Sequence, residues 1–396
     1  MNKKLCWSAD FETTTDKDDC RVWAFALSNI ENPEDFRYGN NIDDFLEFCA
    51  NPKENYNVFF FNLKFDGNFI ISHLLKAGYE YISAAKERRD NTFTTLITDT
   101  GTFYSIEIYF KVKGHHVNKV KITDAMKLFP NFSVERLAES FGLPISKLEL
   151  DYKEKREVGH QLTEHEIEYI KNDVTIVALA LQAMFNRGLT RMTIASNALA
   201  DFKKRCNNFK RYFPELPENV DEDIRASYKG GFTYVNPIYA GKELGNGMTL
   251  DVNSMYPYIL HEMPLPVSVP VYFEGKFEED EQYDLYVQSF SCIFKLKEGK
   301  IPSIQLKHTF GFQSNEYVVS SNDEEIALTL TKPDLELFFE QYDVIKPKWL
   351  GGWKFSSLHH VFDNYIDYWM NEKITAGKEG NKGKKQIAKL MLNSLY

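Results

Sequence analysis

Apolar and polar residues alternate through the first part of the chain in a pattern typical of a sheet with helices packed on it. Residues 5–11 and 22–28 are short apolar runs separated by a charged stretch, as in a β-hairpin. Residues 58–61 form a compact β-like run that leads through a turn into a helix-like stretch at 69–75. Residues 92–122 again alternate apolar and polar types. We therefore expect an α/β (α+β) fold built on a mixed sheet.

The strongest helix signal covers residues 163–186. Thr163 and Glu166 have the spacing of a capping box, and apolar residues then repeat at helical intervals. Gly188 supplies a stop signal after the last turn. Residues 384–396 have a comparable amphipathic pattern, which predicts a helix at that end of the chain.

Prolines and glycines punctuate the second half of the chain. Residues 214–217 contain two prolines and mark a break, and residues 248–253 follow a glycine-rich turn and predict another strand. Residues 263–350 begin in a proline-rich stretch and end at Gly351 and Gly352. These boundaries predict an inserted subdomain.

Composition limits the possible classes of protein. With 396 residues the chain is too long for one hydrophobic core, so two or three domains are expected. The net charge of −10 argues against a protein that coats nucleic acid nonspecifically, but not against an enzyme with a carboxylate-rich metal site. Five scattered cysteines indicate reduced thiols, and no apolar run reaches the roughly 20 residues of a membrane helix. A soluble cytoplasmic protein, without a membrane partner, is expected.

Acidic residues in the first strand are candidates for metal binding. Side chains alternate along a strand, so Asp10 and Glu12 share one face while Phe11 points to the opposite layer. Two neighbouring carboxylates repel each other unless a cation lies between them, and hard oxygen ligands favour Mg²⁺ or Mn²⁺. Taken alone, the pair is more typical of a solvated strand face than of a metal site.

Two later segments add further polar candidates. Asp66 follows the aromatic run and precedes Gly67, in a predicted turn where a carboxylate could also cap a helix. Tyr169 and Asp173 are spaced i and i+4 on the predicted helix, so they share a face at the edge of its apolar stripe. Each feature in isolation is compatible with a purely structural role.

The order of these segments resembles the three exonuclease motifs of proofreading family-B DNA polymerases, in particular the protein-primed polymerases of small tailed phages. The matching segments are DFE at 10–12, NLKFDG at 62–67 and YIKND at 169–173. The resemblance implies a ribonuclease-H-like 3′→5′ exonuclease domain. It also implies two divalent ions about 3.5–4 Å apart, bound by Asp10, Glu12, Asp66 and Asp173. Tyr169 would orient the attacking water.

The same resemblance suggests how a DNA end is held. Lys147, in the segment KLEL, matches a lysine motif of the protein-primed subgroup that lies near the scissile phosphate. Asn62 and Phe65 match residues that hold the frayed single strand. Phe61 stands where relatives can carry histidine, and residues 125–129 depart from another strand-gripping motif. These departures concern the grip on DNA rather than the metal site.

Two further motifs resemble the polymerase part of the family. In YKGG at 228–231, the paired glycines of the family let the backbone approach the template, which implies DNA contacts by Tyr228, Gly230 and Gly231. In DVNSMYP at 251–257, the resemblance implies catalytic metal binding by Asp251 and the backbone of Val252. Within this second motif, Tyr256 would close the sugar pocket and Ser254 would contact DNA. A glycine-rich loop and a strand ending in a proline turn are the structural alternatives.

The segment KLMLNSLY at 389–396 resembles the fingers helix that meets the incoming nucleotide. Lys389, Asn393 and Tyr396 would share one face, with Leu392 and Leu395 turned toward packing. The resemblance implies nucleotide binding by Lys389 and Asn393, assisted by Lys373, and a DNA contact by Tyr396. A solvated lysine-rich helix end is the structural alternative.

The resemblance also predicts a division of the chain. Residues 1–189 would form the exonuclease domain, 190–262 the first part of the palm, 263–350 an insertion that contacts the priming terminal protein, and 351–396 part of the fingers. The family continues with a second palm carboxylate motif and a thumb, which are absent from these 396 residues. We therefore expect an incomplete palm and fingers, and incomplete polymerase catalysis by this chain alone.

Three functional hypotheses follow. In the first, the chain is a protein-primed DNA-directed DNA polymerase with a proofreading exonuclease, which acts in the cytoplasm of an infected or prophage-bearing bacterium. Its expected partners are a terminal protein and a second chain that supplies the missing motif and thumb. Alternatively it is a stand-alone 3′→5′ exonuclease with a vestigial palm, or a nonenzymatic fragment that binds terminal protein or DNA. The expected ligands are single-stranded 3′ ends, primer-template DNA and dNTPs.

Overall fold

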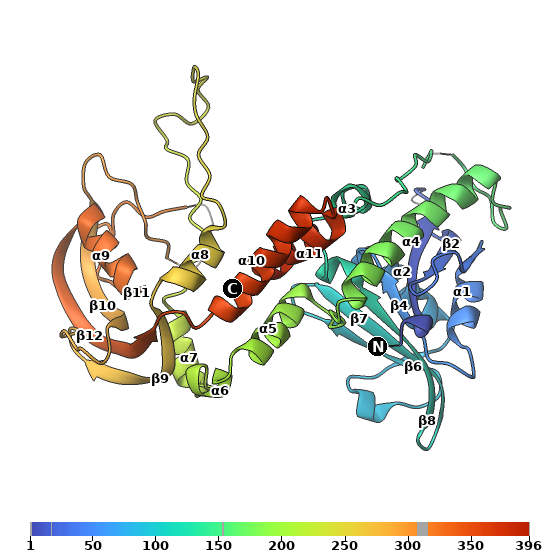
Figure 1. The fold of residues 1–396 in the computed structure, drawn as a ribbon, viewed down its shortest axis with the longest axis horizontal. Coiled ribbons are helices and arrows are strands. Elements are labelled where there is room, and N and C mark those ends of the chain that lie inside the picture. Colours follow the sequence, from blue (N-terminus) through green and yellow to red (C-terminus); the bar gives the residue numbers. More distant parts are fainter. Residues whose placement is uncertain (1, 17, 153, 307–315, 396) are drawn as a thin grey trace. The chain divides into compact units, whose positions relative to one another are not determined.

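The computed structural model describes residues 2–16, 18–152, 154–306 and 316–395 (Figure 1). The chain forms two compact units, Met1–Phe202 with Asp367–Tyr396, and Lys203–Ile366. The predicted mixed α/β fold is confirmed. The unit boundaries fall inside helices α5 (Ile194–Arg205) and α10 (Asp363–Lys378). The functional division into four segments stays a prediction.

An eight-stranded mixed sheet is the framework of the first unit, with the strand order β3-β2-β1-β4-β8-β7-β6-β5. Strands β1 and β2 pair antiparallel, which confirms the predicted hairpin, whereas β1, β4 and β8 run parallel to one another. The strands are β1 (Cys6–Thr13), β2 (Val22–Asn29), β3 (Phe36–Gly39), β4 (Asn57–Phe60), β5 (Glu80–Tyr81), β6 (Thr92–Ile97), β7 (Phe103–Lys113) and β8 (His116–Asp124).

Helices cover both faces of this sheet because β1 is apolar on one side and mixed on the other. Phe11 packs edge-on against Phe45 of α1 (Ile42–Cys49) and Phe60 of β4, in a core that also includes α2 (Leu63–Lys76). On the opposite face the Ser8 hydroxyl donates a hydrogen bond of 2.8 Å to the carbonyl of Val174 in α4 (Glu164–Phe185). The predicted opposite orientation of Phe11 and its acidic neighbours is therefore confirmed.

Helix α4 begins with the predicted capping box. The Thr163 hydroxyl accepts a hydrogen bond from the Glu166 amide, and the Glu166 carboxylate accepts one from the Thr163 amide. Helix α11 (Lys382–Leu392) packs on α3 (Val134–Phe141) and α4 through its apolar face. This helix begins two residues before the predicted start and ends at Leu392. The remaining short helical turns of this unit are η1 (Lys3–Leu5), η2 (Ala85–Glu87) and η3 (Ala125–Lys127).

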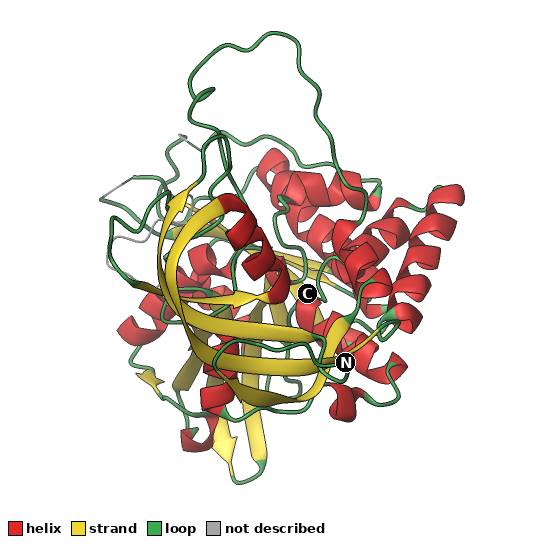
Figure 2. Cartoon of the chain, turned by 90° about the vertical axis from the view of Figure 1, so that its left-hand side faces the viewer, coloured by secondary structure: helices red, strands yellow, loops and turns green. Residues whose placement is uncertain are grey.

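The second unit is built on a four-stranded antiparallel sheet in the order β11-β10-β12-β9 (Figure 2). Helix α9 (Lys332–Gln341) packs on β10, β11 and β12 and buries Phe338 among Phe290 and Phe294. The other elements are β9 (Leu265–Glu274), β10 (Leu285–Leu296), β11 (Ile326–Thr331), β12 (Tyr342–Leu358), α6 (Phe209–Tyr212), α7 (Glu218–Arg225) and α8 (Met255–Glu262).

Gly351 and Gly352 lie inside β12, where a Cβ on Gly352 would fall 1.9 Å from the Val287 carbonyl oxygen, so the glycine is required by close strand packing. The inserted segment 263–350 stays a prediction, and one expectation for this unit is wrong. The strand predicted at 248–253 is absent. Its apolar side chains, such as Leu250, stay exposed because no described strand pairs with the segment. Among the described helices, none is both long and apolar enough to cross a membrane.

Candidate functional site

Three of the predicted acids converge where β1 meets α4. One carboxylate oxygen from each of Asp10, Glu12 and Asp173 lies within 4.8 Å of the others. Asp66, from the first turn of α2, joins them, since its carboxyl group interacts electrostatically with Asp10 and Glu12. Glu12, Asp66 and Asp173 are buried, and Asp10 is partly exposed. The structure thus brings together four acids that are far apart in sequence.

The sheet register explains why there is room for this group, which we call the carboxylate cluster. Asp10 lies opposite Ala26 of β2, and Glu12 lies opposite Ala24. These small residues allow α4 to pack closely over β2, with Val174 in the same buried group as both alanines. The cluster therefore occupies the edge of a packed layer rather than a solvated strand face.

The start of α2 is fixed by an unusual backbone conformation. Asn62 caps the helix with φ 70° and ψ 55°, a left-handed conformation that asparagine adopts more readily than most residues. The backbone N–H of Asn62 donates a hydrogen bond of 3.2 Å to Oδ1 of buried Asp124. The same oxygen accepts a second hydrogen bond of 3.0 Å from the backbone N–H of Met126. Asp66 consequently lies on a helix and not in the predicted loop, because the chain enters the helix directly at Leu63.

Burial and mutual repulsion disfavour negative charge in the carboxylate cluster. Burial raises the pKa of Asp10 to about 7 and that of Glu12 to about 9, and neighbouring carboxylates add to both shifts. The pKa of Asp66 is raised well above its ordinary value by burial and then by Asp10. Burial also raises the pKa of Asp173, while Lys147 opposes that rise. A bound cation would remove this penalty.

Unpaired oxygens indicate where such a cation fits. Asp66 Oδ1 and Asp173 Oδ1 are buried and have no hydrogen-bond partner in the described part of the chain. A buried carboxylate oxygen without a partner is costly, and metal coordination is one way to satisfy it. Since the cluster offers only carboxylate oxygens, the donor set fits Mg²⁺ or Mn²⁺ better than zinc.

Two non-acidic side chains border the cluster. Lys147 donates to Asp173 Oδ2 at 2.5 Å, and its Nζ lies 5.4 Å from the centre of the Tyr169 ring. The Tyr169 hydroxyl lies 2.6 Å from that of Tyr152. Burial, the charge of Glu12 and this hydrogen bond raise the pKa of Tyr169 well above its ordinary value. The phenol is therefore neutral at physiological pH.

An exposed aromatic residue directly precedes Asp66 on α2. Phe65 follows Asn62 on the first turn of α2 and is 51% exposed, although its ring also contacts that of Phe69, 5.6 Å away between centroids. An exposed aromatic ring one residue before Asp66 can stack on a planar group. The predicted strand-holding residues thus lie on the same element as a cluster acid.

Similarity to known proteins identifies the family of this chain. A family model described as DNA polymerase type B, organellar and viral, matches residues 50–396. This chain belongs to that family. The DNA polymerase of Bacillus phage M2 is 43% identical over 398 residues, an alignment that covers all of this chain and 68% of the phage protein. The motif resemblance to family-B phage polymerases is confirmed.

Two solved structures of phi29 DNA polymerase also match. The complex with single-stranded DNA has a TM-score of 0.91 and 40% identity, and the alignment covers 99% of this chain and 66% of that one. The complex with primer-template DNA and incoming nucleotide substrates has a TM-score of 0.89 and 41% identity, with coverage of 99% and 68%. The chain spans about two thirds of the length of these type B polymerases.

The predicted polymerase residues are divided between the two units. In the second unit, Asp251 and Val252 are exposed, Ser254 precedes α8 with φ 53°, and Tyr256 is exposed on that helix. Of the YKGG residues, Tyr228 is 72% exposed, and open space surrounds Gly230 and Gly231. The structure does not gather these residues into a cluster comparable to that of the acids.

The first unit holds the predicted nucleotide-binding residues of α10 and α11. Lys389 and Asn393 are both exposed, while Leu392 is buried, as the helical spacing predicts. Lys373 is partly buried on α10. Tyr396 lies outside the described residues.

Three residues that support the site escaped prediction. Asp124 anchors Asn62, Tyr152 bonds Tyr169, and Arg156 is buried against Glu166 near the start of α4. Asp124 is the last residue of β8, two positions beyond the alternating run at 92–122, and an acid directly after such a run is a signal that could have been used. Tyr152 and Arg156 lie in an irregular segment, where no periodicity shows which way a side chain points.

Proposed function

We propose that the carboxylate cluster is the 3′→5′ exonuclease site of this type B DNA polymerase, and that it hydrolyses the terminal phosphodiester of a single-stranded DNA 3′ end with two Mg²⁺ or Mn²⁺ ions. One observation carries the proposal. Four acids from three separate elements converge, three of them buried, and two of their oxygens have no hydrogen-bond partner among the described residues.

The acids have a direct role in this proposal. Asp10, Glu12, Asp66 and Asp173 would hold the two ions, which supply an activated water at neutral pH and stabilise the leaving 3′ oxygen when bound. The buried positions of Glu12, Asp66 and Asp173 fix the ligand geometry. Low solvent exposure also strengthens the attraction between these carboxylates and a cation.

Tyr169 and Lys147 would position the substrate and water. The neutral Tyr169 hydroxyl can donate one hydrogen bond and accept another, which suits it to orient water rather than to remove a proton. Lys147 carries a positive charge 2.5 Å from Asp173, and that charge is available to a phosphate oxygen arriving at the cluster. We assign Lys147 to the scissile phosphate.

A single strand is the proposed substrate because of the aromatic residue on α2. Phe65 would stack on a terminal base, and Asn62 would hold it by hydrogen bonding. The complex of phi29 DNA polymerase with single-stranded DNA supports this choice, since that protein matches 99% of the chain.

Family membership extends the proposal to the second half of the chain. The proposed roles are template contacts by Tyr228, Gly230 and Gly231, metal binding by Asp251 and Val252, and dNTP and primer contacts by Ser254, Tyr256, Lys373, Lys389, Asn393 and Tyr396. The phi29 polymerase complex with primer-template DNA and nucleotides supports these ligands. Terminal-protein contact by residues 263–350, and a second chain, stay predictions from the motif resemblance.

A nuclease assay tests the central proposal. The purified chain with Mg²⁺ should release mononucleotides stepwise from the 3′ end of a 5′-labelled single-stranded oligonucleotide, and a chelator should stop the reaction. Asp10→Ala/Asp66→Ala should lower the rate by at least about 100-fold, whereas Glu31→Gln, at an exposed acid of the same unit, should not. Equal rates for the double variant and the parent chain would refute the assignment.

A primer-extension assay tests the polymerase role proposed for Asp251. The Asp10→Ala/Asp66→Ala variant is incubated with primer-template DNA, dNTPs and Mg²⁺. Extension that is lost in Asp251→Asn supports the polymerase assignment of that residue. Nuclease activity in the parent chain without extension in any variant would show that these 396 residues alone do not polymerise, as the expected incomplete palm and fingers imply.

A further inference from the structure

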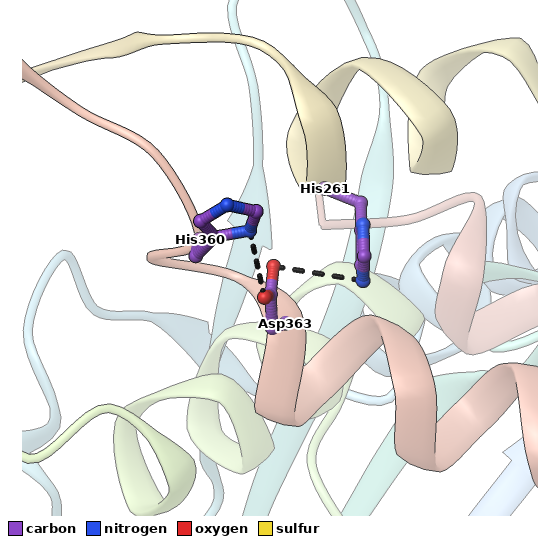
Figure 3. A group of neighbouring side chains, drawn as sticks. All are labelled: His261, His360 and Asp363. Carbon is purple, nitrogen blue, oxygen red and sulfur yellow. Dashed lines mark ion pairs between the residues drawn. The ribbon is translucent and has the colours of Figure 1, made fainter.

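A second group of metal-ligand side chains lies within the Lys203–Ile366 unit. His261 belongs to the last turn of α8, His360 lies just before α10, and Asp363 is the first residue of that helix (Figure 3). His360 Nδ1 lies 2.9 Å from Asp363 Oδ2, and His261 Nε2 lies 3.7 Å from Asp363 Oδ1. One ligand atom from each residue falls within 4.8 Å of the others.

The spacing of these atoms is close to that of a tetrahedral metal site. Ligand atoms bonded to zinc at about 2.0–2.1 Å are separated by about 3.4 Å along each tetrahedral edge. The two nitrogen–oxygen distances to Asp363, 2.9 and 3.7 Å, lie on either side of this value. Small side-chain rotations would therefore be sufficient to admit an ion.

Polar neighbours already orient the ligand atoms. Glu262 Oε1 lies 2.7 Å from His261 Nδ1, and this contact leaves Nε2 of the same ring facing Asp363. A carboxylate bound to the second ring nitrogen is the usual support of a metal-binding histidine, because it fixes the tautomer and increases ligand basicity. His359 Nδ1 lies 3.0 Å from the Glu262 carbonyl oxygen, which ties the segment carrying His360 to the end of α8.

An unsatisfied oxygen points to a missing partner at this group. Asp363 Oδ1 is buried and has no hydrogen-bond partner in the described part of the chain, although it faces His261. His360, with φ 65°, adopts a left-handed backbone conformation while its ring is directed at the same carboxylate. The His360 side chain is 61% exposed, so an ion can reach the group from solvent.

We propose that His261, His360 and Asp363 bind a divalent first-row transition-metal ion of the zinc class, with water completing its coordination. Two imidazoles and one carboxylate suit borderline ions such as Zn²⁺ or Co²⁺, in contrast to the all-oxygen carboxylate cluster. The bound ion links the end of α8 to the start of α10, two segments distant in sequence. It therefore holds in place the helix that carries Tyr256. This inference is independent of the proposed exonuclease.

Metal titration of the full chain tests the site. Transition metals are first removed from the Asp10→Ala/Asp66→Ala variant with a chelator, and excess Mg²⁺ is then added to occupy other carboxylate sites. The protein is titrated with Zn²⁺ in competition with a chromophoric chelator. We expect one equivalent of Zn²⁺ to bind, with affinity lowered at least about 10-fold by His261→Ala, His360→Ala or Asp363→Ala. Co²⁺ should bind in the same proportion and give visible absorption that disappears in His360→Ala.

Matched variants keep the outcome decisive. His116→Ala removes an exposed histidine of the β7–β8 hairpin and should leave zinc binding unchanged. His360 is the most exposed of the three ligands, so His360→Asn should remove a metal ligand without unfolding the protein. Circular dichroism checks that this variant is folded. Absence of stoichiometric zinc binding, or binding that survives all three ligand substitutions, would overturn the proposal and leave the group as a simple histidine–aspartate ion pair.

Discussion

The ammonium nitrogen of Lys147 lies 2.5 Å from Oδ2 of Asp173, at the border of the carboxylate cluster. Burial lowers the pKa of Lys147, but Asp173 and other nearby groups raise it more, so the net pKa is above its ordinary value and the lysine stays charged. In the metal-free protein this charge offsets part of the repulsion among the acids. When ions bind the acids, the same charge becomes available to a phosphate.

Replacing Lys147 separates these two roles. Lys147→Met keeps the length of the side chain but removes its charge, so we expect a fall of roughly 10- to 100-fold in the maximal exonuclease rate. The apparent affinity for Mg²⁺ should stay the same or increase, because a competing positive charge has been removed. Rates measured over a Mg²⁺ titration test both expectations. Lys171→Met, at a partly exposed lysine of α4, is the control; a variant that loses only Mg²⁺ affinity would argue against a phosphate contact.

Removing the Tyr169 hydroxyl tests its role in positioning water. Tyr169→Phe should lower the exonuclease rate by about 100-fold, at the lower end of the range typical of a single catalytic donor. Since the pKa of Tyr169 lies well above its ordinary value, the parent rate should show no ionisation of this group near pH 10. A pH–rate profile of both proteins checks this. Tyr152→Phe should have a smaller effect; a loss of alkaline dependence in Tyr169→Phe would identify the phenol as a base instead.

Local patterns predicted much of the first unit. The alternation of Ser8, Asp10 and Glu12 with apolar neighbours determines which side chains face α4, and the capping box at Thr163 determines where α4 begins. These features depend on nearest neighbours in sequence, which a pattern records directly. The helical spacing of Tyr169 and Asp173 then places both side chains at the cluster.

Features that depend on long-range contacts were not predictable in this way. Asp66 lies on a helix rather than in a loop because Asp124, from a distant strand, fixes Asn62 in a left-handed conformation. Residues 248–253 have the composition of a strand, but a strand needs a partner, and no described segment pairs with them. The group of His261, His360 and Asp363 was not predicted, because strands β9 to β12 lie in the sequence between His261 and the other two residues.

Mg²⁺ should stabilise the chain through the carboxylate cluster. An ion that binds only the folded protein adds stability of about 2.7 kcal/mol at 100 times its dissociation constant. We therefore expect Mg²⁺ to raise the thermal midpoint by several degrees in differential scanning fluorimetry. Asp10→Asn removes one of the crowded charges, so this variant should be at least as stable as the parent chain without metal and should gain less from Mg²⁺. An undiminished gain would place Mg²⁺ binding elsewhere in the protein.

Glu166 links the stability of α4 to pH. Burial alone would raise the pKa of Glu166, but the Thr163 amide, His160 and Arg156 outweigh it and lower the pKa from 4.5 to about 2. A carboxyl whose pKa falls on folding stabilises the folded state above its unfolded pKa, so this contribution is complete above about pH 4.5 and is lost as the pH falls toward 2. Glu166→Gln should cost about 3–5 kcal/mol at neutral pH because it leaves Arg156 buried without its charged partner at 2.7 Å. Urea unfolding measured from pH 7 to 3 should show the difference between parent and variant shrinking below pH 4.5. The control Glu168→Gln, at an exposed acid two residues further along α4, should follow the parent at every pH.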